Sequence, residues 1–282
     1  MPKGQKHHYI PEFYLKQWAG ADGRLCEYSR QHKEVKPHRR HPSETGFERG
    51  LYTLTTYPEP TADIVERKLM KSTDDYASRA LRLLLDDNTK ELDAKTRSGW
   101  ARFIISLMRR SPEAVKDLSE KIRTTFLEVT LSLALPGDPD EDLQERAMRS
   151  RVERGHALLL QDLINSEMIG TRLINMLWFV VNFKDVPHSL LTSDRPFVMT
   201  NGIGHNNSHL AIPISPTKLF LAAATPEEEK RLRTILPEHL VLQMNDRMAL
   251  QARRFVYGVD DKQLRFVANR LGRQAKAGPA DV

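Results

Sequence analysis

Apolar side chains in the middle of the chain recur every three to four positions, which is the spacing of one face of a helix. Within residues 61–86 this face consists of Ile64, Leu69, Tyr76, Ala80, Leu83 and Leu84. Similar spacing predicts further helices over about 93–109, 112–134 and 138–166. We therefore expect a central group of about four helices.

The segments on both sides of these helices have the short apolar runs of β-strands. Residues 24–30 alternate apolar and polar side chains, and "KEVKP" at 33–37 can pair with them. After about residue 168, the pattern predicts strands over 177–183, 190–193, 210–215, 218–224 and 255–259, and helices over 225–236 and 237–254. The order of strands, helices and strands predicts an α+β fold, with a small mixed or antiparallel sheet built from N- and C-terminal strands.

This order also predicts one domain over residues 1–270. The helices at 60–166 form an insertion or subdomain in this interpretation, and a separate helical domain over the same range is the alternative. Residues 271–282 are polar and end in "AGPADV", so we expect a flexible tail.

Composition adds limits on partners and compartment. The chain has 43 basic and 37 acidic side chains, a net charge of +6. This modest surplus allows a nucleic acid or another phosphate-containing ligand without requiring one. Cys26 is the single cysteine, so no intramolecular disulfide can form and the cytoplasm is the expected location. No signal peptide and no membrane-spanning run is expected.

The first candidate for chemistry is the histidine pair in "KHHYIPEFYLKQWAG", at positions 7 and 8. Imidazole titrates near neutral pH and can act as a base or a metal ligand. Adjacent residues of an extended chain point apart, so we expect one histidine to face a given site. Pro11 fits the start of a short helix, where an anion can be held. An ordinary pair, one solvated and one hydrogen-bonded, is the alternative.

Other polar motifs carry weaker signals. Asp194 in "LLTSDRPF" follows a predicted strand, where functional groups collect, although an Asx-turn before Pro196 explains it equally well. Asp63 with "ERK" at 66–68 approaches the Glu-x-Lys pattern of metal nucleases, but in a predicted helix rather than a strand. "HRRH" at 38–41 and "HNNSH" at 205–209 are interpreted as polar loops.

Several fragments, taken in order, resemble the bacterial domain of unknown function 4238 (DUF4238) family: "KHHYIPEFYLKQWA", "LYT" at 51–53, "RRSP" at 109–112, "TSDRPF", "PISP" at 213–216 and "N…ARRFVY" at 245–257. The resemblance implies an uncharacterised bacterial cytoplasmic protein, and it supplies no activity. It also implies a family signature made of His7, His8, Tyr9, Pro11, Tyr14, Asp194, Pro196 and Asn245. Arg195 stands where we expect asparagine in many members of the family.

Together these features predict a hydrolase that acts on a phosphodiester or nucleotide through a His/Asp site, with a divalent metal as an allowed cofactor. The candidate catalytic residues are His7, His8, Asp194 and Asn245. The candidate substrate-binding residues are Lys6, Tyr9, Tyr14, Arg109 and Arg195, and Arg39, Arg40 and Arg110 are further basic groups for phosphate. A histidine of the pair should then lie beside Asp194. A non-catalytic module for nucleic acid or anions, and a protein-interaction partner, are the alternatives.

Overall fold

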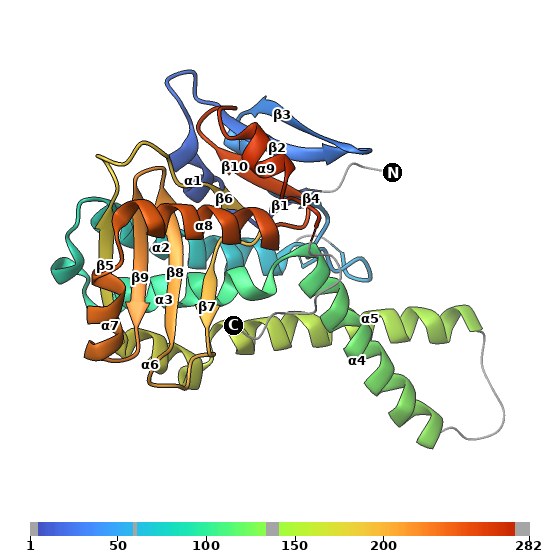
Figure 1. The fold of residues 1–282 in the computed structure, drawn as a ribbon. Helices are drawn as coiled ribbons and strands as arrows, with labels where there is room; N and C mark the ends of the chain where they lie inside the picture. The colour runs from blue at the N-terminus through green and yellow to red at the C-terminus, as the bar shows by residue number, and fades with distance from the viewer. Residues whose placement is uncertain (1–4, 59–60, 134–140, 274–282) are drawn as a thin grey trace.

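The described part of the chain contains three antiparallel sheets (Figure 1). The computed structural model describes residues 5–58, 61–133 and 141–273. The strands are β1 (Lys6–His8), β2 (Leu25–Gln31), β3 (Glu34–Arg40), β4 (Phe47–Arg49), β5 (Leu177–Asn182), β6 (Thr192–Ser193), β7 (Val198–Thr200), β8 (His209–Ser215), β9 (Lys218–Ala223) and β10 (Phe255–Gly258). They pair in the orders β1-β4, β3-β2-β10-β6 and β5-β9-β8-β7.

Helices cover these sheets. They are α1 (Glu12–Leu15), α2 (Lys71–Leu85), α3 (Ala94–Arg109), α4 (Pro112–Leu133), α5 (Glu141–Ile164), α6 (Glu167–Asn175), α7 (Pro226–Arg233), α8 (Pro237–Gln251) and α9 (Leu264–Ala268). A π-helix (Val65–Met70) leads directly into α2. The α+β class and the four central helices are confirmed. The helix expected from residue 61 instead begins at Val65, and α6 and α9 were not predicted.

The central strands β9 and β8 of the β5-β9-β8-β7 sheet are buried on both faces, as their nearly continuous apolar sequences require. Alternate residues of β8 and β9 point to opposite sides. Ile212 and Phe220 pack with Trp100 of α3, whereas Leu221 packs with Met244 of α8. Figure 1 shows α8 across one face of this sheet and α2 and α3 behind the other.

The β3-β2-β10-β6 sheet joins the two ends of the chain. Strand β10 lies between β2 and β6, so residues 255–258 pair with an N-terminal strand and with the segment before Asp194. Helix α1 is tied to the same region, because the Tyr14 hydroxyl lies 2.7 Å from Thr192 Oγ1 and donates to the Pro213 carbonyl at 2.6 Å. The predicted sheet of N- and C-terminal strands is therefore confirmed.

Helices α4 and α5 extend away from the sheets (Figure 1). The two helices pack on each other where Gly155 of α5 lies against Ile122 of α4. The turn predicted at 136–142 and the tail predicted at 271–282 fall largely outside the described residues. None of the described helices is both long enough and apolar enough to cross a lipid bilayer.

Candidate functional site

Strand β1 places the two histidines in different surroundings. It pairs with β4, so that His7 is opposite Glu48 and His8 is opposite Phe47. Successive side chains of a strand point to opposite faces. His7 is buried with 0% exposure, whereas His8 is half-buried. The two imidazoles therefore leave β1 on opposite faces and differ in burial.

His7 is hydrogen-bonded at one ring nitrogen, and the other lies near a carboxylate without a hydrogen bond. Its Nδ1 accepts the backbone N–H of Tyr52 at 2.9 Å, and the two rings stack with 5.5 Å between their centroids. Because Nδ1 accepts, the neutral ring carries its proton on Nε2. Nε2 lies 3.4 Å from Asp63 Oδ1, a loose ion-pair distance. Burial lowers the pKa of His7 and Asp63 opposes this change, so the imidazole is neutral at pH 7.

Arg110 is fixed at the junction of α3 and α4. Its side chain has 0% exposure, and Nη1 donates to Asp74 Oδ1 of α2 at 2.9 Å. The guanidinium also lies over the Phe103 ring, 5.3 Å from its centroid. The Arg110 carbonyl accepts the Tyr52 hydroxyl at 2.6 Å, which connects this residue to the His7 side of the site.

Glu66 adds a titrating carboxyl group from the π-helix. Burial raises its pKa to about 7, with Asp74 and Asp63 acting in the same direction and Arg110 against it. Near neutral pH this carboxyl group therefore exists in both protonated and ionised forms. π-helical turns inside longer helices are frequent at functional sites, and this turn sets the position of Glu66.

Unpaired polar atoms are concentrated here. Among the described residues, eight buried side-chain nitrogens and oxygens have no hydrogen-bond partner, and six of them belong to this region. The six are Nε2 of His7 and of His8, the Tyr9 hydroxyl, Glu66 Oε2, and Nε and Nη2 of Arg110. Buried polar groups are nearly always paired in native proteins, so such a concentration indicates a site for a ligand or ordered water.

We call this set the Arg110 cluster. Arg110 acts electrostatically on His8, Tyr52, Glu66 and Asp74, and Tyr9 acts on Tyr52. The cluster comprises His7, His8, Tyr9, Tyr52, Asp63, Glu66, Asp74 and Arg110. It reaches the surface through His8, Glu66 and Asp74, which are half-buried.

The geometry of Arg110 suits an oxyanion. Nη1 is occupied by Asp74, and Nε and Nη2 form the other edge of the guanidinium. This edge donates two parallel hydrogen bonds to a carboxylate or a phosphate. Tyr9 can add an O–H donor, and His8 is kept neutral because burial lowers its pKa. The cluster thus combines donors for an anion with groups that can move a proton.

Asp194 does not meet either histidine in a described hydrogen bond. Its Oδ1 accepts the N–H of Arg253 at 2.9 Å, and its Oδ2 accepts those of Arg254 at 2.6 Å and Phe255 at 3.1 Å. Burial raises the pKa of Asp194 to about 6, and these three donors oppose the rise. Within the cluster, Asp194 acts on Tyr9, whose pKa is raised by burial and then by the Asp194 charge. The carboxylate beside the His7 imidazole is Asp63.

Asn245 lies on α8 with its amide turned into the protein. Its Oδ1 accepts the N–H of Leu191 at 2.7 Å, and its Nδ2 donates to the Ser189 carbonyl at 2.9 Å and to Gln263 Oε1 at 3.1 Å. Asn245 therefore connects α8 to the segment that leads into β6. It is not among the residues of the Arg110 cluster.

Fragments of the resemblance from both ends of the chain are thus in contact, since Tyr14 of α1 bonds to Thr192 of β6 and β6 pairs with β10. A sequence comparison matches residues 6–262 to the family described as "Protein of unknown function (DUF4238)". The chain belongs to this family. No curated protein and no solved structure matches it.

The remaining predicted binding residues of this DUF4238 chain lie around the cluster or apart from it. Lys6 Nζ donates to the Ser43 carbonyl at 3.1 Å and lies 4.5 Å from the Phe47 ring centroid. The Tyr14 hydroxyl is used by Thr192 and Pro213, as described above. Arg109 is exposed on α3, and Arg195 is half-buried with its described hydrogen bonds made by the backbone.

Sequence patterns predicted only some residues of the cluster. Asp63 and "ERK" at 66–68 resemble a nuclease motif only weakly because that motif lies on a strand, and Glu66 indeed lies in a helix, the π-helix Val65–Met70. Tyr52 lies in the "LYT" fragment of the family resemblance but was not a predicted site residue, and Asp74 had no local signal. Arg39 and Arg40 lie in β3 rather than in a loop, where Arg39 pairs with Asp22 and Arg40 with Glu27.

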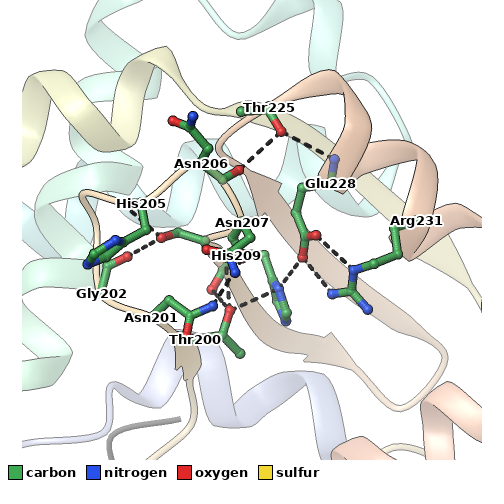
Figure 2. A network of polar contacts seen from close by, with 11 residues as sticks. Thr200, Asn201, Gly202, His205, Asn206, Asn207, His209, Thr225, Glu228 and Arg231 are labelled. Atoms are coloured by element: carbon green, nitrogen blue, oxygen red, sulfur yellow. Dashed lines mark hydrogen bonds and ion pairs between the residues drawn. The ribbon is translucent and has the colours of Figure 1, made fainter.

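A second polar network in the DUF4238 chain surrounds His209 (Figure 2). His209 Nδ1 lies 2.7 Å from Glu228 Oε1 and 3.0 Å from Thr200 Oγ1, and Arg231 holds the same carboxylate at 2.6 and 2.8 Å. One nitrogen serves both neighbours, so the imidazole cannot relay a proton from the threonine to the glutamate. This network fastens α7 to β7 and β8, and His205 of the "HNNSH" motif is exposed in a turn.

Metal binding has no ready-made centre in the described part of the chain. No group of three or more His, Cys, Asp or Glu side chains is arranged there to hold an ion. The carboxylates of the Arg110 cluster are the acids nearest to the candidate site.

Proposed function

We propose that this chain is a hydrolase that binds a phosphodiester or nucleotide at the Arg110 cluster. The observation that carries the proposal is the edge formed by Nε and Nη2 of Arg110, which is buried and has no hydrogen-bond partner among the described residues. A buried guanidinium edge without a partner is costly, and an oxyanion would satisfy it. The cytoplasm stays the expected compartment on the basis of the single cysteine.

The proton-transfer groups support hydrolysis rather than another reaction. In the proposed step, a water oxygen attacks phosphorus and the bond from phosphorus to the leaving oxygen breaks. His8, neutral and open at Nε2, accepts the proton of the water, and protonated Glu66 donates its proton to the leaving oxygen. Arg110 stabilises the charge that develops on the phosphoryl oxygens. His7 and Asp63 are positioning residues in this scheme.

A binding module that holds a phosphate-containing ligand without cleaving it is the second candidate. One observation favours it: of the two imidazoles in the cluster, only His8 offers a base, because Nδ1 of the neutral His7 ring already accepts the Tyr52 N–H and Nε2 carries the proton. An imidazole held in this way cannot accept a further proton without losing a contact. Such a module would use the same Arg110 edge for the same anion, including the backbone of a nucleic acid.

Adjacent arginines provide the test. Arg110→Lys keeps the positive charge beside Asp74 but removes the two-pronged edge, whereas Arg109→Lys changes an exposed neighbour on the same helix end. Four single variants, Arg110→Lys, Arg109→Lys, His8→Gln and Glu66→Gln, are compared with the unmodified chain. Each is incubated with plasmid DNA, RNA, nucleotides and bis(p-nitrophenyl) phosphate. Each assay is run with EDTA, Mg²⁺, Mn²⁺ or Zn²⁺. Nucleotide affinity is measured in parallel by calorimetry.

The rate of hydrolysis by Arg110→Lys should be lower than that of the unmodified chain by about 100-fold or more, which is the usual effect of removing one donor to a developing oxyanion. Arg109→Lys should stay within twofold. Nucleotide binding that depends on Arg110 without any cleavage would establish the binding module instead. Cleavage or binding that is equal in Arg110→Lys and Arg109→Lys would contradict both candidates.

A further inference from the structure

A cavity of about 440 Å³ lies between the π-helix and α5, separate from the Arg110 cluster. Its volume is within the range of small-molecule sites, about 300–1,000 Å³. The walls are mainly apolar and include Leu54, Ile64, Leu69 and Leu158. Leu158 keeps 52% exposure, a high value for a leucine, because its side chain borders this open space.

Two basic side chains line the same cavity from opposite walls. Lys68 comes from the π-helix, four residues after Ile64, and Arg154 comes from α5, four residues before Leu158. Each wall therefore presents a cation beside a branched apolar side chain. Neither cation forms an ion pair with the side chains that the structure describes, those of residues 5–58, 61–126 and 145–273. The charge at the cavity is thus positive and available to a ligand.

Residues 54–57, which contribute Leu54 and Tyr57 to the cavity lining, are attached to α5 by side-chain contacts. The Glu153 carboxylate of α5 accepts the hydroxyls of Thr55 and Thr56 at 2.5 and 2.7 Å, and also the Thr56 N–H at 3.0 Å. The Ser150 hydroxyl donates to the Tyr57 hydroxyl at 3.2 Å. These bonds attach the 54–57 segment to α5, and the Glu153 carboxylate is occupied by Thr55 and Thr56.

We propose that this cavity binds a free amphiphilic anion, an apolar chain or ring that ends in a carboxylate. The apolar body would lie against Ile64, Leu69 and Leu158, and the carboxylate would lie between Lys68 and Arg154. Charge complementarity selects this ligand, since a neutral apolar molecule would leave both cations without a partner. The inference does not depend on the hydrolase activity proposed above.

Calorimetric titration with decanoate below its micelle concentration tests the site in the full-length chain. We expect saturable binding of one decanoate per chain. The double variant Lys68→Gln/Arg154→Gln should bind decanoate at least tenfold more weakly than the unmodified chain does. Decanol, which lacks the carboxylate, should bind to the unmodified chain with an affinity lower than that of decanoate by a similar factor. Ala157→Phe, which places a ring in the cavity, should abolish binding.

Matched controls separate the cavity from general stickiness. Lys71→Gln and Leu159→Phe change an exposed lysine and an exposed leucine that do not line the cavity, and both should bind decanoate as the unmodified chain does. Melting temperatures verify that each variant is folded. The proposal is overturned if decanoate does not bind, if the double variant and Ala157→Phe bind it normally, or if only vesicles of anionic phospholipid bind.

Discussion

Glu66 shows how one residue links the stability of the protein to its chemistry. Its carboxyl group lies near Asp63 and Asp74, and burial first, then these two charges, raises its pKa to about 7. In an unfolded chain the same group has its ordinary pKa of 4.5. The folded state therefore holds a proton on Glu66 over a range of pH in which the unfolded state has lost it.

This difference predicts a pH dependence of folding. Because the folded pKa is the higher one, the stability contributed by this proton is complete below pH 4.5 and is lost as pH rises through 7. Glu66→Gln cannot lose the proton. The free energy of unfolding of Glu66→Gln, relative to the unmodified chain, should rise between pH 4.5 and 7 and stay constant above. Urea unfolding measured at several pH values gives this difference.

Glu34→Gln is the matched control, because Glu34 is an exposed carboxyl group on β3. Its unfolding free energy should follow that of the unmodified chain across the same pH range. If the curves of Glu66→Gln and the unmodified chain run parallel from pH 4 to 8, Glu66 does not share the buried charge environment of Arg110, and its role as proton donor fails with it.

Residues with long-range partners explain where sequence reasoning stopped. The histidine pair is visible as an unusual local pattern, so His8 could be named from the sequence, whereas "RRSP" alone is not specific and Arg110 was expected only as one of several basic groups for phosphate. Tyr52 and Asp74 reach the cluster only because β4 and α2 fold against it, and no spacing rule connects them. Asn245 is similar: its amide bonds residues 189 and 191 from a helix 54 residues later.

At the scale of elements, several of the helices that the sequence predicts begin at local capping groups. Asp93 accepts the Thr96 N–H at 2.7 Å before α3, and Thr225 accepts the Glu228 N–H at 3.3 Å before α7. Helix α6 was missed although Ser166 caps it, because Gly170 interrupts its pattern and a strand follows at once. The π-turn was not predictable, since its hydrogen-bond pattern depends on the helices packed around it.

The contact between α2 and α3 gives a prediction at this scale. A Cβ atom at Gly99 of α3 would lie 2.5 Å from Tyr76 Cβ of α2, closer than real Cβ atoms approach. Gly99→Ala must therefore move the two helices apart. We expect the free energy of unfolding to fall by about 1–3 kcal/mol, the usual cost of overpacking. Urea unfolding measures this change.

Gly170 of α6 provides the comparison, because a Cβ there meets no atom within 4 Å. Gly170→Ala should stabilise the chain by up to about 1 kcal/mol, since alanine favours the helix. Equal effects of the two substitutions would show that helix propensity, rather than the close approach of α2 and α3, controls the response.

For the whole molecule, the main structural event is the meeting of the chain ends. The sequence predicted this meeting, and the pairing of β10 with β2 confirms it. It did not predict which groups carry the contact. Asp194 binds three consecutive N–H groups at residues 253–255, and its own N–H donates to the Phe255 carbonyl at 3.0 Å. The carboxylate thus anchors the start of β10 to the end of β6.

Asp194→Asn separates this anchoring role from a catalytic one. An asparagine keeps one acceptor oxygen but places an N–H₂ group against backbone donors, so at least one buried N–H loses its partner. We expect the free energy of unfolding to fall by about 1–3 kcal/mol. The activity or ligand affinity of the molecules that stay folded should change by less than threefold. Asp185→Asn, at an exposed position, should leave both quantities unchanged.

The two measurements must be made on the same preparation, because a destabilised protein can lose activity simply by unfolding. Urea unfolding gives the folded fraction, and nucleotide affinity is then expressed per folded molecule. If Asp194→Asn keeps its stability but loses binding or cleavage to the same extent as Arg110→Lys, then Asp194 acts in the chemistry. The site would then extend from Arg110 past Tyr9 to β6, and the closing of the chain ends would itself assemble it.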